Sequence, residues 1–480
     1  MKEKLEAMLY KVVELSNNKY IAAIKEGVIS VIGITIIGSF FLLIAYPPVP
    51  QHWFETIGIF KWIAQNREII LLPFQATMSI ITIFVIIATA HHLARSSELP
   101  VIPTIIISLI AFFMTLDWTR VIEAISFKEI IITAENQNMM MQLLQLDTLP
   151  NIGDKFNIAS GNIKSLGLVM PLSNMGSKGM FVGFLCVIIV CSIFKFFKTR
   201  NLTIKMPDGV PDGVIRSFEA LIPLLVIVLL FLSLHLIPAF LPTVFPDGII
   251  DLHKLLQKLF FWLPLIVNSL PGALIMVFFI CLLWCIGIHG SSVVEAFTFP
   301  VLLQLFEANA QAFINGEPIP YILTNQFYYS FVWIGGGGGT LGLVILMAFM
   351  SKSKYMKVLG KSSLAPCLFN INEPIVFGTP IVLNPYLMLP YIVGPMTCVI
   401  ISYLATKLGF ISQTVAAVPW TFPAPLYAYF ATGGDWKAII LVVVNLSILT
   451  IMYLPFFIKY DKKLLLEEMN ESNESSENKD

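Results

Sequence analysis

Two ionisable residues lie in stretches of otherwise apolar sequence, and both have side chains that could take part in chemistry. His289 occurs in GIHGSSVVE, residues 287–295, where Gly287 and Gly290 flank it with Ile288 intervening. Glycines let a backbone approach closely and can end a helix, and an ionisable residue in apolar sequence is a functional candidate by default. His289 is therefore either a functional residue or, with equal weight, a histidine that packs by hydrogen-bonding a carbonyl.

The second ionisable residue, Glu373, occurs in APCLFNINEPIVFGTPIVLNPYLMLP, residues 365–390. Pro374 biases Glu373 away from helical geometry, and a carboxylate in a nearly uncharged stretch is costly unless it has partners. Asn370 and Asn372 offer amide donors and acceptors, which suit the hydroxyl groups of a sugar. This segment is therefore a candidate functional site, with a purely structural role for Glu373, stapling a hairpin, as the alternative.

Five consecutive glycines occur in WIGGGGGTLGL, residues 333–343. Each glycine in a helix interior costs roughly 1 kcal/mol relative to alanine, so something must require them. Close helix packing, a break in the helix, or backbone exposed to substrate would each do so, and Gly335 and Gly336 are our candidates for substrate contact. A phosphate-cradling loop is not indicated, since neither the lysine pattern nor the strand context of a P-loop follows.

Two further residues are candidate substrate ligands. Trp420 lies in VPWTFPAPLYAYF, residues 418–430, where it could stack on the apolar face of a pyranose ring or anchor the chain at the membrane interface. Arg95, in HHLARSSELP, is most simply a charge in an inside loop, and a role in the substrate pathway is the alternative.

The composition indicates that membrane helices position these residues. Of 480 residues, 57% are hydrophobic and only 12% charged, with a mean hydropathy of +0.81. Soluble domains carry about a quarter charged residues, so a bilayer is the solvent that fits. The 30 basic and 30 acidic residues cancel, and no global field points to nucleic acid. The six cysteines lie mostly in apolar runs and are predicted to be small core residues: Cys186, Cys191, Cys281, Cys285, Cys367 and Cys398.

Apolar runs long enough to cross roughly 30 Å of hydrocarbon recur along the chain. Short cytoplasmic loops should be rich in Lys and Arg, and the most basic loops are 195–216, 352–361 and 459–463. One crossing per run would put the second of these loops outside. The runs lie near 27–46, 71–90, 100–116, 179–194, 217–241, 269–288, 328–350, 380–405, 408–428 and 438–458.

Two adjustments place all three basic loops inside. Residues 291–312 should cross or dip as an extra element, and 408–428, which three prolines interrupt, should enter and leave on one side. Together with a second re-entrant segment near 366–379, this predicts an all-α polytopic membrane protein with about ten crossings. Amphipathic interfacial helices complete the predicted fold, and both termini are cytoplasmic.

The same pattern predicts two membrane halves joined by a connector. The first 25 residues should form a surface helix, and the long polar segment 117–178 should lie outside. The predicted units are an N-terminal membrane half at 1–241, an interfacial amphipathic connector at 242–268, a C-terminal half at 269–460, and a disordered cytoplasmic tail at 461–480.

At the candidate residues the sequence resembles the membrane subunit, enzyme IIC, of the phosphoenolpyruvate-dependent sugar phosphotransferase system, of the lactose/cellobiose/diacetylchitobiose type. The resemblance rests on NEPIVFGTPIVLNP at 372–385, on the glycine cluster followed by TLGL at 340–343, and on GIHG at 287–290. It extends over nearly the whole chain in the order of the spans. One departure is Gly337, where the family commonly has a serine among the glycines.

The resemblance implies a homodimer, with an N-terminal interface domain and a C-terminal domain that carries sugar like an elevator. It implies a disaccharide near His289 and Glu373, the two catalytic residues, which contact the C6 hydroxyl that is phosphorylated. The phosphoryl donor would be a phosphocysteine on a separate enzyme IIB, which enzyme IIA, HPr and enzyme I supply, because no IIB domain is expected after residue 463. The basic loop 352–361 could steer enzyme IIB at the cytoplasmic face of a bacterial plasma membrane. No cofactor is expected.

Two other classes compete with this interpretation. A proton-coupled secondary sugar transporter could use Glu373 and His289 as proton carriers, and composition alone cannot separate it from group translocation. The resemblance favours the phosphotransferase system. An intramembrane protease is disfavoured, because no HExxH or GxSxG motif occurs.

Overall fold

The computed structural model describes residues 18–49, 52–116, 172–204, 206–207, 210–240, 250–379 and 381–477, and four short strands between residues 126 and 162. Within this part of the chain the elements are almost all helices. Those of the N-terminal half are α2 (Lys19–Ser30), α3 (Ile32–Ala45), α4 (Trp53–Thr56), α5 (Gly58–Gln65), α6 (Arg67–Ile70), α7 (Leu72–Met78), α8 (Ile81–Ser96), α9 (Val101–Phe113), the 3-10 helices η1 (Leu172–Asn174) and η2 (Ser177–Gly179), α11 (Met180–Thr199), α12 (Asp212–Glu219) and α13 (Leu221–Phe240).

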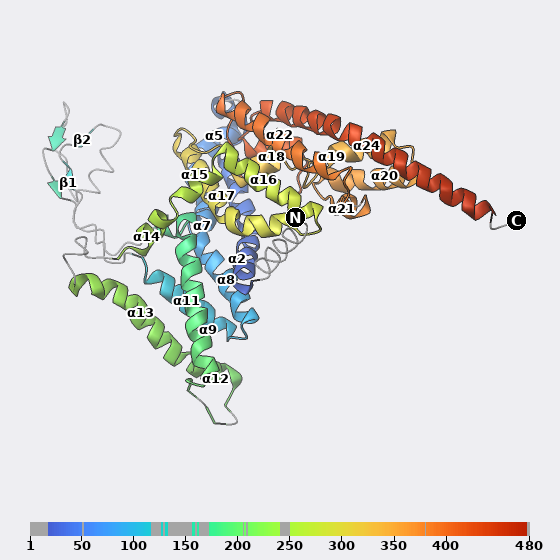
Figure 1. The fold of residues 1–480 in the computed structure, drawn as a ribbon. Coiled ribbons are helices and arrows are strands. Elements are labelled where there is room, and N and C mark those ends of the chain that lie inside the picture. The colour runs from blue at the N-terminus through green and yellow to red at the C-terminus, as the bar shows by residue number, and fades with distance from the viewer. Residues whose placement is uncertain are drawn as a thin grey trace.

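The connector and the C-terminal half continue the helical pattern. Their helices are α14 (Leu252–Leu259), α15 (Trp262–Val267), α16 (Leu270–Cys285), α17 (Gly290–Asn315), α18 (Asn325–Phe331), α19 (Leu341–Met350), α20 (Lys354–Leu368), α21 (Glu373–Gly378), α22 (Met388–Lys407), α23 (Ala424–Ala431) and α24 (Lys437–Glu477). Figure 1 shows the two halves diverging, with α11 to α13 in one arm and α18 to α24 in the other.

The strands belong to the long polar segment that was predicted to lie outside. They are β1 (Ser126–Phe127), β2 (Ile130–Ile132), β3 (Phe156–Ile158) and β4 (Gly161–Asn162). β1 pairs with β4 and β2 with β3, both antiparallel. The remainder of residues 117–171 lies outside the described residues, as do residues 1–17 of the predicted surface helix.

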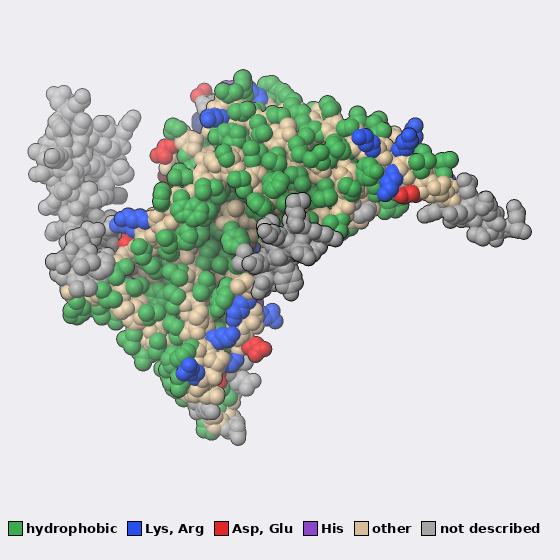
Figure 2. All heavy atoms as spheres, in the orientation of Figure 1, with side chains coloured by type: hydrophobic (Ala, Val, Ile, Leu, Met, Phe, Trp, Pro, Cys, Tyr) green, Lys and Arg blue, Asp and Glu red, His purple; other side chains and the backbone are tan. Residues whose placement is uncertain are grey.

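The helices have the length and surface of membrane spans. Among the described residues, five are long and apolar enough to cross a bilayer: Lys19–Ala45, Arg67–Ser96, Ser177–Thr199, Met388–Lys407 and Lys437–Asn470. Shorter apolar helices are Val101–Phe113, Leu221–Ile237, Leu270–Cys285 and Leu341–Met350. Figure 2 shows hydrophobic side chains over most of the visible face, and soluble proteins rarely expose such large apolar patches. The prediction of a helical polytopic membrane protein is confirmed.

Helix α17 packs against both halves of the molecule. On one side Val301, Leu302 and Leu305 join the buried apolar cluster of the C-terminal half. On another side Leu303 and Phe306 join a cluster made mainly of N-terminal residues. All six cysteines are free and buried, as predicted for small core residues.

The apolar run at 328–350 is not the continuous span that its hydropathy predicts. α18 ends at Phe331 and α19 begins at Leu341, and the glycine-rich loop lies between them. Gly335, Gly336, Gly338 and Gly339 have positive φ angles, between 65° and 95°. L-residues avoid this left-handed region. The glycines therefore break the helix, which is one of the three explanations that the sequence left open.

Both segments predicted to be re-entrant reverse direction in the structure. α21 turns back along α20, and the Tyr355 hydroxyl donates to the Gly378 carbonyl at 2.8 Å. In the second segment the chain runs without helix from α22 to α23, and the Val415 N–H donates to the Ala431 carbonyl at 2.7 Å.

The tail prediction is wrong over the described residues, because α24 continues without a break to Glu477. Two carboxylates of α24 hold the start of α20. Asp461 accepts the N–H groups of Lys352 and Ser353 at 2.9 and 3.2 Å, and Glu468 accepts the Ser353 hydroxyl at 2.6 Å. Carboxylates at a helix N-terminus satisfy its free N–H groups and its dipole, so the polar tail has partners that its composition does not reveal.

Candidate functional site

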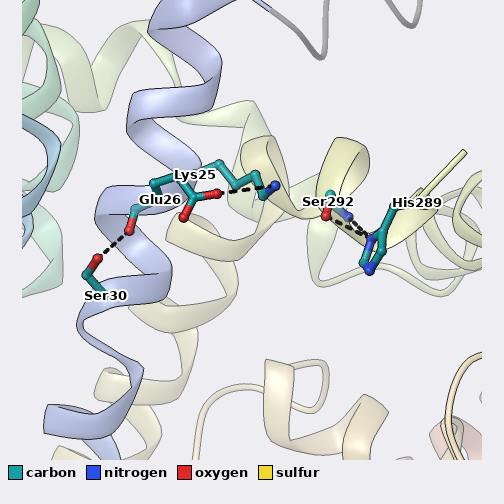
Figure 3. A network of polar contacts seen from close by, with 5 residues as sticks. All are labelled: Lys25, Glu26, Ser30, His289 and Ser292. Atoms are coloured by element: carbon teal, nitrogen blue, oxygen red, sulfur yellow. Dashed lines mark hydrogen bonds and ion pairs between the residues drawn. The ribbon is translucent and has the colours of Figure 1, made fainter. Parts of the chain in front are cut away.

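His289 occupies the junction between α16 and α17. It is the N-cap of α17, and its Nδ1 accepts the Ser292 N–H at 3.1 Å and lies 2.8 Å from the Ser292 hydroxyl (Figure 3). An Nδ1 that accepts an N–H carries no proton in the neutral ring, so the proton lies on Nε2. The His289 side chain is exposed. It therefore presents an N–H donor to a ligand.

Trp284 connects His289 to the Glu373 segment. Its ring centroid lies 4.4 Å from that of His289 and 6.4 Å from that of Phe377 in α21. The Leu383 N–H, which follows α21, donates to the Cys285 carbonyl at 2.8 Å. Trp284 itself is only 8% exposed. The GIHG and NEP motifs, more than 80 residues apart in sequence, are therefore packed together.

Glu373 is the first residue of α21, directly after the N-cap Asn372. A carboxylate in the first turn interacts favourably with the helix dipole. The Glu373 side chain is exposed. Glu373 and His289 are thus both exposed, and Trp284 links the segments that carry them.

Asn372 holds the glycine-rich loop in place. Its Nδ2 donates to the Gly337 carbonyl at 2.7 Å and to the Thr340 hydroxyl at 3.2 Å. A Cβ on Gly336 would lie 2.5 Å from the Asn372 side chain. The structure therefore packs Asn372 against Gly336 of the loop, and contact of these residues with substrate stays a prediction. Because both amide hydrogens already bond within the protein, only the Oδ1 acceptor of Asn372 remains for a sugar.

Asn370 joins three of the candidate segments. Its Oδ1 accepts the Gly335 N–H at 3.0 Å, and its Nδ2 donates to the carbonyls of Trp420 and Phe422 at 2.7 and 2.9 Å. Asn370 has a φ of 62°, a conformation that asparagine tolerates better than most residues. The Trp420 ring is 42% exposed. The buried side-chain amide of Asn370 thus holds the glycine-rich loop and the segment that carries Trp420 next to each other.

A cavity of about 110 Å³ lies beside His289, between α2 of the N-terminal half and α17 and α18. Figure 3 shows Lys25 reaching from α2 toward Ser292, and Lys25 also pairs with Glu26 at 3.4 Å. The cavity combines a lysine, a carboxylate, hydroxyls and aromatic rings, a set that suits a sugar. It is lined by Lys25, Val28, Ile29, Ile32, His289, Ser291, Ser292, Glu295, Phe299 and Tyr329.

Sequence reasoning missed Lys25 and Glu295 as candidate residues of the site. Glu295 ends the segment that we singled out for His289, and its carboxylate in an apolar run was a signal of the same kind. Lys25 carried no such signal, because the expected surface helix accounted for its charge. Only the packing of α2 against α17 brings it to the cavity.

Arg95 lies apart from the other candidates. It is exposed in the last turn of α8. Beyond the end of that helix, the Glu98 carbonyl accepts a hydrogen bond from Lys198, which belongs to the basic end of α11. Among the described residues no hydrogen bond or ion pair joins Arg95 to the site. This placement favours the inside-loop explanation, and a role in the substrate pathway stays a prediction.

Comparison with known proteins identifies the family of this fold. The family model described as "Phosphotransferase system, EIIC" matches residues 25–395. The chain is 34% identical to the lichenan permease IIC component of Bacillus subtilis (strain 168), over 95% of this chain and 92% of that protein. It is 33% identical to the cellobiose-specific EIIC component of Geobacillus stearothermophilus, over 96% of this chain and 94% of that protein.

A solved structure agrees with the sequence relatives. The crystal structure of the transporter ChbC, the IIC component from the N,N'-diacetylchitobiose-specific phosphotransferase system, matches with a TM-score of 0.80 at 30% identity. The match covers 95% of this chain and 96% of that one. The fold, the order of the helices and the sequence thus agree over almost the whole length, and the chain belongs to the EIIC family of the phosphotransferase system.

Proposed function

We propose that this chain is the permease that carries a disaccharide of the cellobiose, chitobiose or lactose type across the membrane and presents its C6 hydroxyl to phosphorylated enzyme IIB. The contact that carries the proposal is the one around Trp284, whose ring lies 4.4 Å from that of His289 and packs against α21, the helix that Glu373 begins. The two segments that carry an N–H donor and a carboxylate are thereby packed together.

The two side chains have different roles in this mechanism. The neutral His289 ring has its proton on Nε2, so it donates to the sugar and cannot accept a proton there. Glu373 is then the base: it accepts the C6 hydroxyl proton as the oxygen attacks phosphorus. The new bond joins this oxygen to phosphorus, the phosphorus–sulfur bond of the enzyme IIB phosphocysteine breaks, and the cysteine leaves as a thiolate.

The lysines of α20 offer a docking surface for enzyme IIB. Lys354, Lys357 and Lys361 are exposed along this helix, which leads to the turn before Glu373. A positive patch steers a negatively charged partner toward the site. We propose further that both termini are cytoplasmic in a bacterial plasma membrane, and that the N-terminal half forms a homodimer interface.

One experiment separates this function from proton-coupled transport. Proteoliposomes carrying the chain are loaded with the soluble phosphotransferase proteins and phosphoenolpyruvate, and labelled cellobiose, chitobiose and lactose are offered outside. We expect sugar phosphate to accumulate only when enzyme IIB is present. Uptake of free sugar that a pH gradient alone drives would contradict group translocation and support the alternative, in which Glu373 and His289 carry protons.

A further inference from the structure

Two adjoining cavities lie at the end of α17 remote from His289. One, of about 500 Å³, lies between α17 and the start of α11, and the other, of about 270 Å³, extends under α14 and α15. They share the lining residues Lys178, Gln304 and Ala308. Small-molecule sites occupy roughly 300–1,000 Å³, so the two together offer the space of a binding site.

The walls of these cavities are polar where they meet. α17 contributes Gln304, Glu307 and Gln311, which recur at helical spacing on one face. The Glu307 carboxylate is held at one oxygen, since its Oε2 accepts the Ser177 N–H at 2.7 Å. Aromatic surface lies alongside, where the rings of Phe181 and Phe260 stack with centroids 5.3 Å apart. Amides, a carboxylate and aromatic faces are the inventory that recognises a sugar.

One buried polar atom in these walls has no partner among the described residues. His253 is 2% exposed with an unpaired Nδ1, and it lines the smaller cavity. Buried polar groups are almost always hydrogen-bonded. A hydroxyl group of a ligand would satisfy this atom.

The position of the cavities fits an entry point. Glu307 follows His289 by 18 residues in α17, which is about 27 Å along a helix. Ser177 and Lys178 lie at the opposite end of the α11 span from its basic residues Lys195 and Lys198, which mark the predicted inside. The cavities therefore open at the predicted outer side.

We infer that these cavities form an outer binding site for the disaccharide, which occupies it before the sugar reaches His289 and Glu373. Gln304 and Gln311 would bind its hydroxyl groups, with Glu307 as an acceptor and the Phe181–Phe260 stack against the apolar face of a ring. The inference rests on the proposed function, because it takes the same disaccharide as its ligand.

The test compares access from the two sides of the membrane. Right-side-out and inverted vesicles carry the wild type, Gln304→Ala with Gln311→Ala, or the isosteric Gln304→Glu, and sugar phosphate formation from cellobiose is measured. We expect the variants to raise KM for cellobiose offered outside about tenfold more than KM for cellobiose offered at the inner face. Gln65→Ala, an exposed residue of α5, is the matched control.

Equal changes on both sides, or an unchanged outside KM, would overturn the outer site. Direct titration of the purified chain with cellobiose distinguishes absence of the outer site from failure of the proposed transport function. If the wild type makes no sugar phosphate from either side, the proposed function fails and the titration decides alone. Loss of a cellobiose site in the Gln304 and Gln311 variants then supports the outer site, and an unchanged titration overturns it.

Discussion

The side-chain amide of Asn370 donates to the main-chain carbonyl of Trp420 at 2.7 Å, across 50 residues of sequence. The same nitrogen bonds the Phe422 carbonyl, and the Oδ1 of Asn370 accepts from Gly335. This one residue therefore fixes the positions of the glycine-rich loop and the proline-rich hairpin relative to the segment that holds Glu373. Its removal has a consequence that can be measured.

Asn370→Asp should destabilise the C-terminal half by about 1–3 kcal/mol, because the part-buried carbonyls of Trp420 and Phe422 lose the side-chain donor that they share. The aspartate matches asparagine in shape, so the effect reports the donors and not packing. Thermal unfolding of the detergent-purified protein measures it. Asn66→Asp, at an exposed position whose amide bonds only the Trp62 carbonyl of its own helix, should change the midpoint little. Equal shifts for the two variants would contradict the role of Asn370.

The two glycines Gly337 and Gly338 should respond differently to a side chain. Gly338 has a φ of 79°, and a Cβ there would lie 2.1 Å from the Tyr391 ring. Gly338→Ser should therefore prevent folding or abolish transport. Gly337 is the member of the run whose φ is not positive. A Cβ there would lie 3.1 Å from the Tyr391 hydroxyl, and its other neighbours, on Trp284 and Asn372, would be 3.9 and 4.0 Å away.

Gly337→Ser should keep transport close to wild type, and its hydroxyl can bond the Tyr391 hydroxyl, which has no partner among the described residues. Vesicle uptake and size-exclusion profiles compare the two variants. This contrast agrees with the serine that the family resemblance leads us to expect at this point. A folded, active Gly338→Ser protein would contradict this prediction, because it would show that the loop accepts a residue with a side chain at this positive φ angle.

Glu373→Gln should retain cellobiose binding better than phosphoryl transfer. Glutamine keeps the size and one acceptor oxygen but cannot take the C6 proton, and general-base catalysis contributes typically 10²–10⁴-fold. We expect a rate loss of that order with a dissociation constant within several-fold of wild type. Equilibrium binding and single-turnover transfer from phosphorylated enzyme IIB measure the two quantities. An equal loss of both would make Glu373 a ligand and not a base.

The lysine face of α20 should control the encounter with enzyme IIB. Lys357→Glu with Lys361→Glu should raise KM for phosphorylated enzyme IIB at low salt, and the difference from wild type should shrink as salt screens the charges. The rate at saturating enzyme IIB should change less. Lys61→Glu, exposed on α5, is the control. A salt-independent defect would argue against electrostatic steering.

The sequence was sufficient where local chemistry decides the structure. Hydropathy located the membrane helices, and the prolines of the 408–428 segment predicted the interruption that the structure shows before α23. His289 and Glu373 were recognisable because an ionisable residue in apolar sequence needs a reason. That the segments carrying them pack together was not predictable from spacing, because it depends on Trp284, which packs between two motifs that the sequence separates widely.

Two of the misses have a common physical cause. The role of Lys25 depends on α2 packing against α17, and the order of the tail depends on Asp461 and Glu468 meeting the first residues of α20. Both are long-range contacts between polar groups that a solvated surface would explain equally well. The prediction of one continuous span at 328–350 was wrong for a different reason. Hydropathy is averaged over a window of residues and does not detect the backbone conformation that glycines permit.

The contacts at the start of α20 determine how the α20–α21 hairpin can move. Asp461 and Glu468 fasten that end of the helix to α24, and Tyr355 fastens α21 to the same end through the Gly378 carbonyl. The α20–α21 hairpin therefore has no free hinge between the lysine face and Glu373. A movement of the lysine face would therefore move the Glu373 carboxylate with it. Docking of the phosphoryl donor and positioning of the sugar would then occur in a single movement of the hairpin.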